Sequence, residues 1–183
     1  LEGLMTAGAF AAAVSAYHAQ EAGFGALTPW IGLIAGGLFG VLFAVIHAVA
    51  TITFRADQVV SGIVINFIAA GSTVYLVKQL FEGAGETSLV NETFHKVAIP
   101  LLSDIPVIGQ GLFNAYPTTY VAFILVAVIY YVLYKTPFGL RLRAVGEHPS
   151  AADTVGIKVL RMRYTAVLLS GLLAGFGGAT IAM

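Results

Sequence analysis

Residues 28–54 read TPWIGLIAGGLFGVLFAVIHAVATITF, and no charged residue occurs between Ala22 and Phe54. A helix needs about 20 apolar residues to cross roughly 30 Å of hydrocarbon, so this stretch predicts a membrane span. Three further stretches contain no charge: 58–77, 105–134 and 164–183. A soluble domain of this length would have to expose several such apolar faces to water. The sequence therefore predicts an integral membrane protein that crosses the bilayer several times.

The composition supports this class and excludes others. The chain has 183 residues, of which 58% are hydrophobic and only 10% charged, against about 25% charged in soluble domains. Nine basic residues balance nine acidic ones, which argues against a nucleic-acid partner because such proteins carry a basic surface. Cysteine is absent, so neither a disulfide framework nor a thiolate metal site can form.

The fold class predicted from these patterns is all-α and polytopic. We expect five transmembrane helices, at about residues 4–20, 31–53, 59–79, 118–134 and 164–183. The chain begins without an initiator Met and both ends fall in apolar runs. We therefore expect one transmembrane domain over 1–183, as a fragment of a longer protein.

Basic residues predict the orientation. Segment 135–163 holds six of the nine Lys and Arg residues, and an excess of basic residues marks cytoplasmic loops. The alternation of spans then places segment 82–119 outside. Prolines and glycines in 82–119 break any long helix, and the sequence leaves open whether this segment re-enters the bilayer.

Small residues recur at the spacing of helix–helix contacts. Gly32, Gly36 and Gly40 lie four residues apart, and Gly171 and Gly175 repeat that spacing. Such spacing lets helix backbones approach closely in lipid. Close packing is the favoured interpretation, and helices that slide or bend around a pathway are the alternative.

Polar residues inside the spans are candidates for function. Asn66 lies near the middle of the third span, and Ser61 precedes it by about one turn. An amide in hydrocarbon needs a hydrogen-bond partner. We favour a tether to a neighbouring helix, with contact to a polar solute as the alternative. His47 is interpreted as a packing residue whose polar ring is satisfied.

The basic segment predicts a short helix. Ser150 followed by Asp153 resembles a capping box, and Gly156 suits the position just past a helix C-terminus. A helix at about 150–155, with Ala151 and Ala152 exposed, is too short to be stable alone. It would serve as a rigid knob for a partner's groove. A basic loop that merely sets topology is the alternative, and composition alone favours it.

Several enzyme signatures are missing. The sequence contains no G-x-x-x-x-G-K-[ST] phosphate loop and no H-E-x-x-H zinc motif. It also contains no G-x-S-x-G nucleophile elbow. The sequence therefore predicts that this chain is not an enzyme and does not hydrolyse ATP.

The basic segment resembles a known family. FGLRLRAVGE at 138–147, followed by Pro149, Ala151, Ala152, Asp153 and Gly156-Ile157, resembles the cytoplasmic signature of permease subunits from binding-protein-dependent ABC importers. The branch for branched-chain amino acids, ribose and nucleosides matches, and its nucleoside members are most similar. Further stretches resemble that branch: LEGLM at 1–5, VVSG at 59–62 through Asn66, and the segment around 99–109.

The resemblance implies an architecture and partners. It implies a type II-like importer permease of roughly ten membrane helices, each about 20 residues long. The partners would be an ATPase subunit that holds ATP and Mg, a second permease subunit of the same or another kind, and an external solute-binding lipoprotein. The chain itself would bind no cofactor, and it would lie in the plasma membrane of a bacterium or archaeon.

The resemblance also implies site residues. The short helix would be the coupling helix that docks on the ATPase, and its contact residues would be Glu147, Ala151, Ala152, Asp153, Gly156, Arg141 and Arg143. The two arginines could instead fix the segment at the lipid surface. Asn66, Ser61 and Glu2 are the candidate residues of the solute pathway.

Two alternatives remain at this stage. A permease of the same class could carry ribose, another sugar or a branched-chain amino acid. A channel or secondary transporter would work without an ATPase, but such proteins usually place ionisable residues at mid-membrane. The predicted spans lack them apart from Lys78 near one end.

Overall fold

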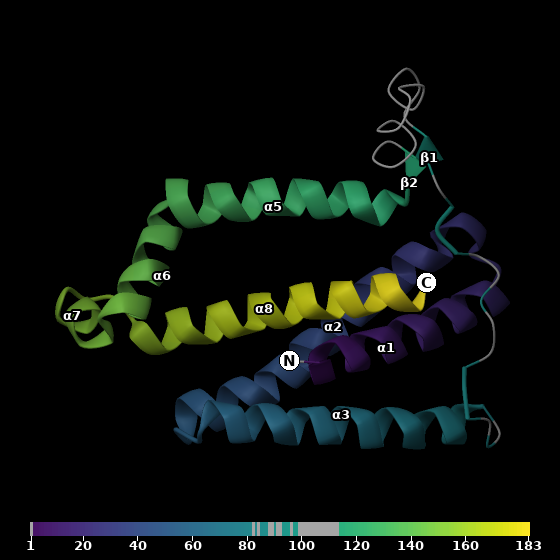
Figure 1. The fold of residues 1–183 in the computed structure, drawn as a ribbon, viewed down its shortest axis with the longest axis horizontal. Coiled ribbons are helices and arrows are strands. Elements are labelled where there is room, and N and C mark those ends of the chain that lie inside the picture. The colour runs from purple at the N-terminus through teal and green to yellow at the C-terminus, as the bar shows by residue number, and fades with distance from the viewer. Residues whose placement is uncertain are drawn as a thin grey trace. The chain divides into compact units, whose positions relative to one another are not determined.

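The computed structural model of the chain describes residues 2–81, 83, 85–87, 90, 93–95, 97–98 and 114–183. They form two compact units, Leu1–Thr93 with Lys158–Met183 and Phe94–Ile157. The elements of the first unit are α1 (Glu2–Glu21), η1 (Gly25–Leu27), α2 (Thr28–Ala48), η2 (Val49–Thr53), α3 (Gln58–Leu80) and α8 (Val159–Ala182). Those of the second are β1 (Val97–Ala98), β2 (Asn114–Ala115), α5 (Pro117–Lys135), α6 (Pro137–Glu147) and α7 (Pro149–Thr154). The colour in Figure 1 follows the chain from α1 to α8.

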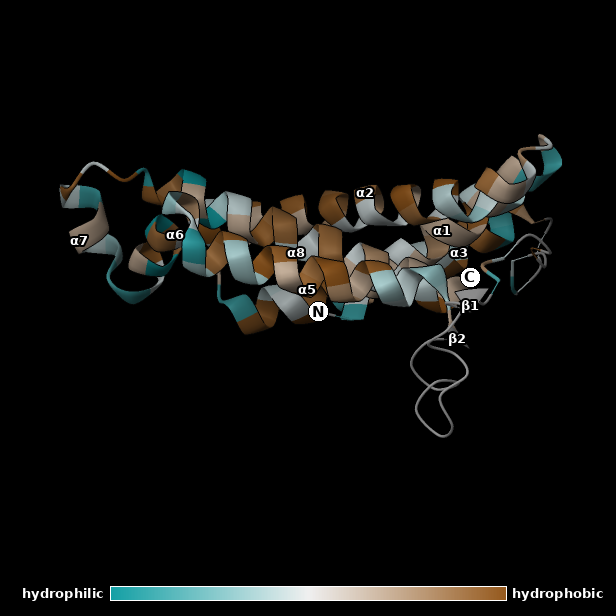
Figure 2. Cartoon of the chain, turned by 90° about the horizontal axis from the view of Figure 1, so that it is seen from above, coloured by the Kyte–Doolittle hydropathy of each residue, from teal (hydrophilic) through white to brown (hydrophobic). Residues whose placement is uncertain are grey.

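Four helical segments of the described residues are long and apolar enough to cross a membrane. They are Gly25–Thr53, Gln58–Leu80, Pro117–Lys135 and Val159–Ala182, and they coincide with four of the five expected spans. Figure 2 shows the apolar residues along these helices and more polar ones at their ends and in α6 and α7. The all-α, polytopic membrane fold is confirmed.

Helix α1 coincides with the remaining expected span but is less apolar. It has 20 residues, and most of its buried positions are alanine or glycine: Gly3, Leu4, Ala7, Gly8, Ala11, Ala12, Ala16 and Ala19. Small side chains contribute little hydropathy, yet they allow neighbouring helices to approach. The composition of α1 is therefore that of a helix covered by other helices, and α2, α3 and α8 all pack against it.

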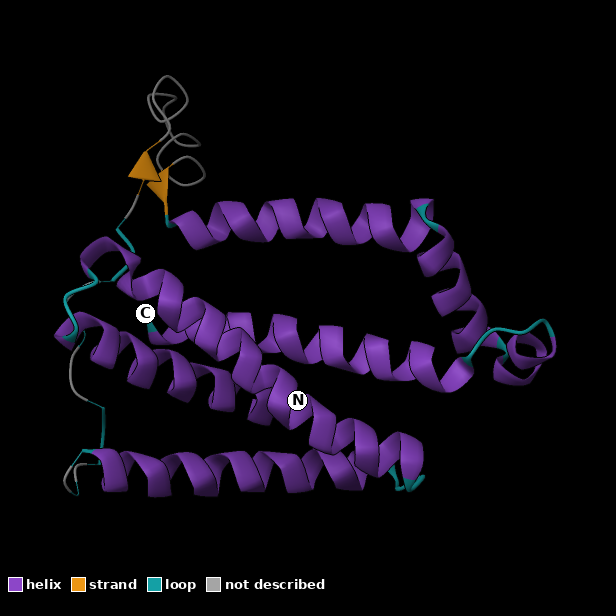
Figure 3. Cartoon of the chain, turned by 180° about the vertical axis from the view of Figure 1, so that it is seen from behind, coloured by secondary structure: helices purple, strands orange, loops and turns teal. Residues whose placement is uncertain are grey.

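The glycines predicted to pack helices do so. A Cβ built on Gly36 would lie 2.8 Å from the carbonyl oxygen of Gly8, and one on Gly40 would lie 2.8 Å from Cα of Gly175. A Cβ on Gly8 would also lie 2.7 Å from Cα of Gly175. The backbones of α1, α2 and α8 thus touch where all three lack side chains. We call these four residues the glycine seam. Figure 3 shows α2 crossing the other helices of this unit obliquely.

Helix α3 adds the fourth wall of this unit. Asp57 caps its start, since the carboxylate accepts hydrogen bonds from the backbone N–H groups of Val59 at 2.7 Å and Val60 at 3.2 Å. Its buried residues recur every fourth position, at Ser61, Ile65, Ala69 and Thr73. This spacing places one face toward the core. The core cluster joins Ile65 and Ala69 to residues of α1 and α2: Leu4, Ala7, Phe43 and Ala44.

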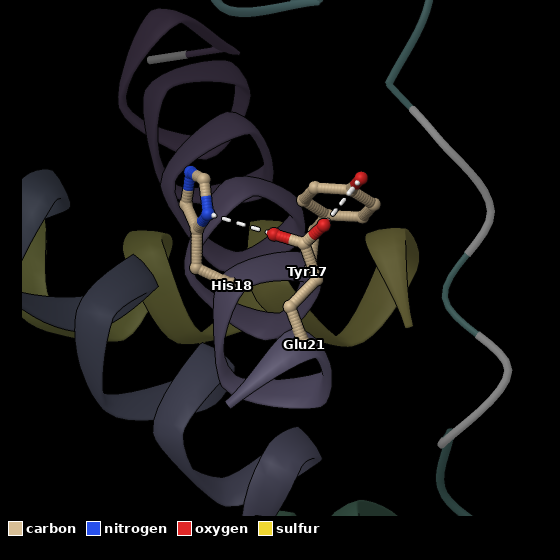
Figure 4. Close-up of polar contacts among 3 residues, drawn as sticks. All are labelled: Tyr17, His18 and Glu21. Carbon is tan, nitrogen blue, oxygen red and sulfur yellow. Dashed lines mark hydrogen bonds and ion pairs between the residues drawn. The ribbon is translucent and has the colours of Figure 1, made fainter. Parts of the chain in front are cut away.

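A polar cluster marks the end of α1. The hydroxyl of Tyr17 lies 3.0 Å from Oε1 of Glu21, and Nδ1 of His18 lies 3.5 Å from Oε2 of the same carboxylate (Figure 4). The Tyr17 ring also meets that of Phe81, just past α3, edge-on at 5.2 Å between centroids. The C-terminal ends of α1 and α3 therefore lie together, as the predicted alternation of spans requires.

The connection from α2 to α3 contains an unusual backbone. Arg55 has a φ of 55°, and it is the only non-glycine residue with positive φ in the described part of the chain. The left-handed conformation costs an L-residue roughly 1–2 kcal/mol. It permits the N–H of Ala56 to reach the carbonyl of Ala50 at 3.0 Å, which closes the end of the helix. Glycine usually occupies such a position.

The second unit contains a helix that we did not predict. Helix α5 ends before Pro137, as expected, but Pro137 also starts α6. The hydroxyl of Thr136 accepts the N–H of Gly139 at 3.2 Å and donates to the carbonyl of Val132 at 2.5 Å. A threonine cap followed by proline is a known helix-start signal. At the other end of α5, β1 and β2 pair antiparallel, Val97 with Ala115 and Ala98 with Asn114. Most of 82–119 lies outside the described residues.

Candidate functional site

Helices α6 and α7 form a compact projection beyond the C-terminal end of α5. A Cβ on Gly139 would collide with the carbonyl oxygens of Val132 and Leu133, so the first turn of α6 packs tightly against the last turn of α5. Val145 is the buried apolar side chain of α6. We call residues 137–157 the projection.

Helix α7 begins differently from our prediction. Its N-cap is His148 and Pro149 is its first residue, so Ser150 lies inside the helix and forms no capping box. Proline is favoured there because the first helical N–H has no partner in any case. The predicted capping role of Ser150 is therefore wrong, although the helix itself, Pro149–Thr154, is confirmed.

The end of α7 follows the prediction. Gly156 has a φ of 83°, and its N–H donates to the carbonyl of Asp153 at 2.9 Å. The N–H of Ile157 donates to the carbonyl of Ala152 at 3.1 Å. These two bonds are the Schellman motif, which terminates a helix with glycine in the left-handed conformation. Gly156 therefore fixes the direction in which the chain leaves the projection.

The projection exposes only part of the predicted contact surface. Ala151 is exposed, but Ala152 retains only 4% of its accessible surface. The prediction that both alanines are exposed is wrong, because α7 packs against α6 and Ala152 is its buried residue. Val155 is 74% exposed instead. Ala151 and Val155 are four residues apart in the sequence and both exposed; we call these two residues the apolar tip.

The projection also exposes charged side chains. Glu147, Asp153 and Arg141 are exposed, and no ion pair to them is found in the part of the chain that the structure describes. Arg143 places its guanidinium 4.9 Å from the ring centroid of Tyr134, a cation–π contact between α6 and the end of α5. Protein contact surfaces combine apolar residues with polar and charged ones, and the projection exposes both kinds.

The second candidate site lies between α1 and α3. Oδ1 of Asn66 accepts the backbone N–H of Gly3 at 2.7 Å. A Cβ on Gly3 would lie 2.9 Å from both Cα of Asn66 and the carbonyl oxygen of Ile65. The two backbones therefore touch at this point. The predicted hydrogen bond from Asn66 to a neighbouring helix is confirmed, and its partner is a backbone N–H of α1.

This part-buried contact lies about two turns into α3. Asn66 is eight residues from the start of α3, which places it about 12 Å along a helix at 1.5 Å per residue. The amide nitrogen of Asn66 has no hydrogen-bond partner among the described residues. Glu2, which precedes Gly3, is exposed. Asn66 therefore contacts the residue that follows Glu2, and the amide nitrogen of Asn66 and the exposed carboxylate of Glu2 are both unpaired among the described residues.

Ser61 faces a different neighbour. Its Oγ lies 2.9 Å from Nδ1 of His47 in α2, and both residues are buried. This confirms that His47 is a packing residue with a satisfied ring nitrogen. The predicted pathway residues thus separate into the pair Glu2 and Asn66, beside α1, and Ser61, beside α2.

Replacing Asn66 with alanine tests whether this residue tethers α1 to α3 or only contacts a solute. The N–H of Gly3 would lose its acceptor, and hydrogen bonds between membrane helices contribute about 1 kcal/mol. We expect Asn66→Ala to lower the unfolding free energy of the full-length protein in detergent by roughly that amount. The control is Ser72→Ala, because that hydroxyl bonds only Ala69 of its own helix. Unchanged stability with weaker solute uptake would contradict the tether.

Metal chemistry finds no support in this part of the chain. No group of three or more His, Cys, Asp or Glu that could hold a metal ion occurs among the described residues.

Comparison with known proteins identifies the family. The family described as "branched-chain amino acid transport system / permease component" matches residues 1–183, the whole of this sequence. The chain belongs to this permease family. Its members are non-catalytic transport components, in agreement with the missing enzyme motifs.

Individual relatives of this permease carry more specific names. It is 48% identical, over 100% of its length and 57% of the relative's, to a guanosine ABC transporter permease protein, NupQ, of Bacillus subtilis. The same identity and shares hold for a nucleoside ABC transporter permease protein, NupC, of Lactococcus lactis. A putative glucose ABC transporter permease protein of Haloferax volcanii is 32% identical over 84% of this chain and 46% of its own length. No solved structure matches.

The chain spans just over half the length of these curated relatives, which agrees with the expectation of a fragment. The projection and the contact between α1 and α3 are therefore parts of a larger permease.

Proposed function

We propose that the complete protein is the membrane-spanning subunit of an ATP-driven importer for nucleosides. The observation that carries this proposal is the 48% identity, over the entire chain, to a guanosine permease and to a nucleoside permease. ATP and Mg would be bound by a separate ATPase subunit, and an external lipoprotein would deliver the solute. A second permease subunit, identical or different, would complete the pathway.

The projection is the proposed contact with the ATPase. It carries an exposed apolar tip, Ala151 and Val155, beside the exposed carboxylates of Glu147 and Asp153. The Schellman motif at Gly156 and the packing of Ala152 would restrict the motion of the tip. A tip that does not deform would transmit a movement of the ATPase subunit to α8, the next helix in the chain. Arg141 would pair with the ATPase, whereas Arg143 makes a cation–π contact with the ring of Tyr134.

The proposed orientation places the projection in the cytoplasm. Segment 135–163 carries six of the nine basic residues, and basic residues are retained on the cytoplasmic side. Segment 82–119 would then lie outside. The paired ends of α1 and α3, joined through Tyr17 and Phe81, agree with the alternation this requires. The membrane would be the plasma membrane of a bacterium or archaeon.

The proposed solute pathway passes the contact between α1 and α3. Asn66 bonds the backbone of Gly3, next to the exposed Glu2, and its amide nitrogen offers two hydrogens. Polar groups inside a membrane protein face a wet cavity or a partner because lipid cannot solvate them. Ser61 would not touch the solute. It would act indirectly, because its hydrogen bond with His47 positions the start of α3 against α2.

Uptake measurements test this function. In proteoliposomes that contain the complete importer, we expect uptake of labelled uridine or guanosine to depend on ATP and on the binding protein. Unlabelled nucleosides should compete, and ribose or leucine should not. Uptake that persists without ATP would instead identify a channel or secondary transporter.

One observation favours a second substrate class. The Haloferax relative is named as a putative glucose permease, so a sugar is the alternative substrate. Competition by ribose or glucose at concentrations that leave leucine without effect would select this alternative over nucleosides.

A further inference from the structure

A pocket lies where the end of α2 meets the start of α8. Its volume is about 510 Å³, and it is lined by Thr51, Ile52, Thr53, Arg55, Leu160, Arg163 and Tyr164. Pockets that hold small ligands have volumes of about 300–1,000 Å³. All lining residues belong to the first compact unit. The pocket lies at the ends of two helical segments that are long and apolar enough to span a membrane, so we infer that it lies near the membrane surface.

The polar groups of this pocket suit an anion. Arg55 and Arg163 contribute two permanent positive charges, and no acidic side chain is among the lining residues. The nearby carboxylate of Asp57 is used by the cap of α3. Arginine presents planar N–H groups that match phosphate oxygens. Two arginines around one cavity therefore favour an anionic ligand such as a phosphate over an uncharged, apolar ligand.

The hydroxyls leave one further donor. Oγ1 of Thr53 and the hydroxyl of Tyr164 lie 2.5 Å apart and tie the two walls together. This pair uses one of its two hydroxyl hydrogens, so the other can be donated to a ligand. The hydroxyl of Thr51 already donates a hydrogen bond to the carbonyl oxygen of His47 at 2.8 Å.

Arg55 occupies a backbone position that usually favours glycine. At the corresponding turn after α7 the chain uses Gly156, which adopts positive φ without strain. At residue 55 the chain keeps an arginine in the same strained region. The π-helical turn η2, which also lines the pocket, is a second irregular element, and such turns occur frequently at functional sites. Packing alone does not account for Arg55, since its side chain is exposed.

We propose that this pocket binds a phosphate group at the membrane surface, with Arg55 and Arg163 as its ligands and an anionic lipid headgroup as its source. Basic pockets between membrane helices hold anionic headgroups in this way. The neighbouring Ile52 and Leu160 would contact the first carbons of the lipid. The proposal does not depend on which solute the permease carries.

Lipid binding to the full-length protein tests the proposal. The protein would be placed in nanodiscs of phosphatidylcholine with increasing phosphatidylglycerol, and retained lipid would be counted by native mass spectrometry. We expect Arg55→Gln and Arg163→Gln each to weaken retention of phosphatidylglycerol about tenfold or more, because each removes a charge-assisted hydrogen bond. Arg161→Gln is the matched control, since Arg161 is an exposed arginine of α8 outside the pocket.

A second variant keeps the test independent of folding. Arg55→Gly relieves the positive-φ strain and should raise the unfolding temperature while it lowers phosphatidylglycerol retention as Arg55→Gln does. Such opposite changes cannot come from a damaged fold.

The remaining arms separate the sources of phosphate. Inorganic phosphate that displaces phosphatidylglycerol at millimolar concentration would support the phosphate site and assign it to free phosphate. Equal losses in Arg161→Gln, or no preference for phosphatidylglycerol over phosphatidylcholine, would overturn the proposal. Full lipid retention by the pocket variants, with loss of ATPase binding instead, would also overturn it and assign the arginines to a protein contact.

Discussion

Replacing Gly40 with leucine is expected to prevent α2 from packing against α8. A Cβ at this position would lie 2.8 Å from Cα and 2.9 Å from the backbone nitrogen of Gly175, and it would also collide with the carbonyl oxygen of Gly171. These obstacles are backbone atoms, which cannot rotate away as a side chain could. Overpacking costs about 1–3 kcal/mol even where side chains can adjust. We therefore expect Gly40→Leu to lower the free energy of unfolding by more than about 3 kcal/mol.

The measurement is the yield of monodisperse protein in detergent and its unfolding temperature. Gly71→Leu is the control, because nothing lies within 4 Å of a Cβ built on Gly71. Gly71→Leu should keep nearly the yield of the unaltered protein, whereas Gly40→Leu should aggregate. Equal behaviour of the two variants would show that the glycine seam is not what holds the unit together.

Replacing Ala151 with arginine is expected to abolish ATP-driven uptake while the protein still inserts. Ala151 is exposed on the apolar tip of the projection, so a larger side chain there does not disturb the fold of the chain itself. In a docked complex it would place a bulky cation in the centre of the contact, and an unpaired buried charge costs several kcal/mol. We expect uptake to fall by at least about 100-fold, which corresponds to roughly 2.8 kcal/mol.

The control for this variant is Ala56→Arg. Ala56 is another exposed alanine, between α2 and α3, and by the proposed topology it faces the same side of the membrane. That variant should retain uptake within about twofold, as surface changes usually do. Normal uptake by Ala151→Arg would remove the projection from the mechanism.

The membrane helices could be predicted because hydrocarbon imposes a simple rule. Charge-free runs near Leu33, Ile65 or Leu168 can be long enough to span only as helices, since every backbone group must be paired inside lipid. The close packing at Gly36, Gly40 and Gly175 followed from their four-residue spacing, whereas Gly8, which completes the glycine seam, was not predicted. Helix α1 was also predicted, although alanine makes its hydropathy weaker than that of its neighbours.

The details of the sites depended on contacts that no local pattern contains. Asn66 was known to need a partner, but Gly3 is 63 residues away. Ala152 looked equivalent to Ala151 because α6, which buries it, was not predicted. The signal for α6 was present as Thr136-Pro137, a cap followed by a proline, and we interpreted Pro137 only as the end of α5. The pocket required Thr53 and Tyr164, 111 residues apart, to meet.

The most direct test of the account is whether the tip of the projection touches an ATPase subunit on the cytoplasmic side. The chain contains no cysteine, so Ala151→Cys introduces one reactive group into it. In inside-out vesicles with the complete importer, a short bifunctional reagent should link this cysteine to the ATPase, and an impermeant reagent should not reach it in right-side-out vesicles. Labelling from the outer face without a link to the ATPase would contradict both the topology and the coupling role.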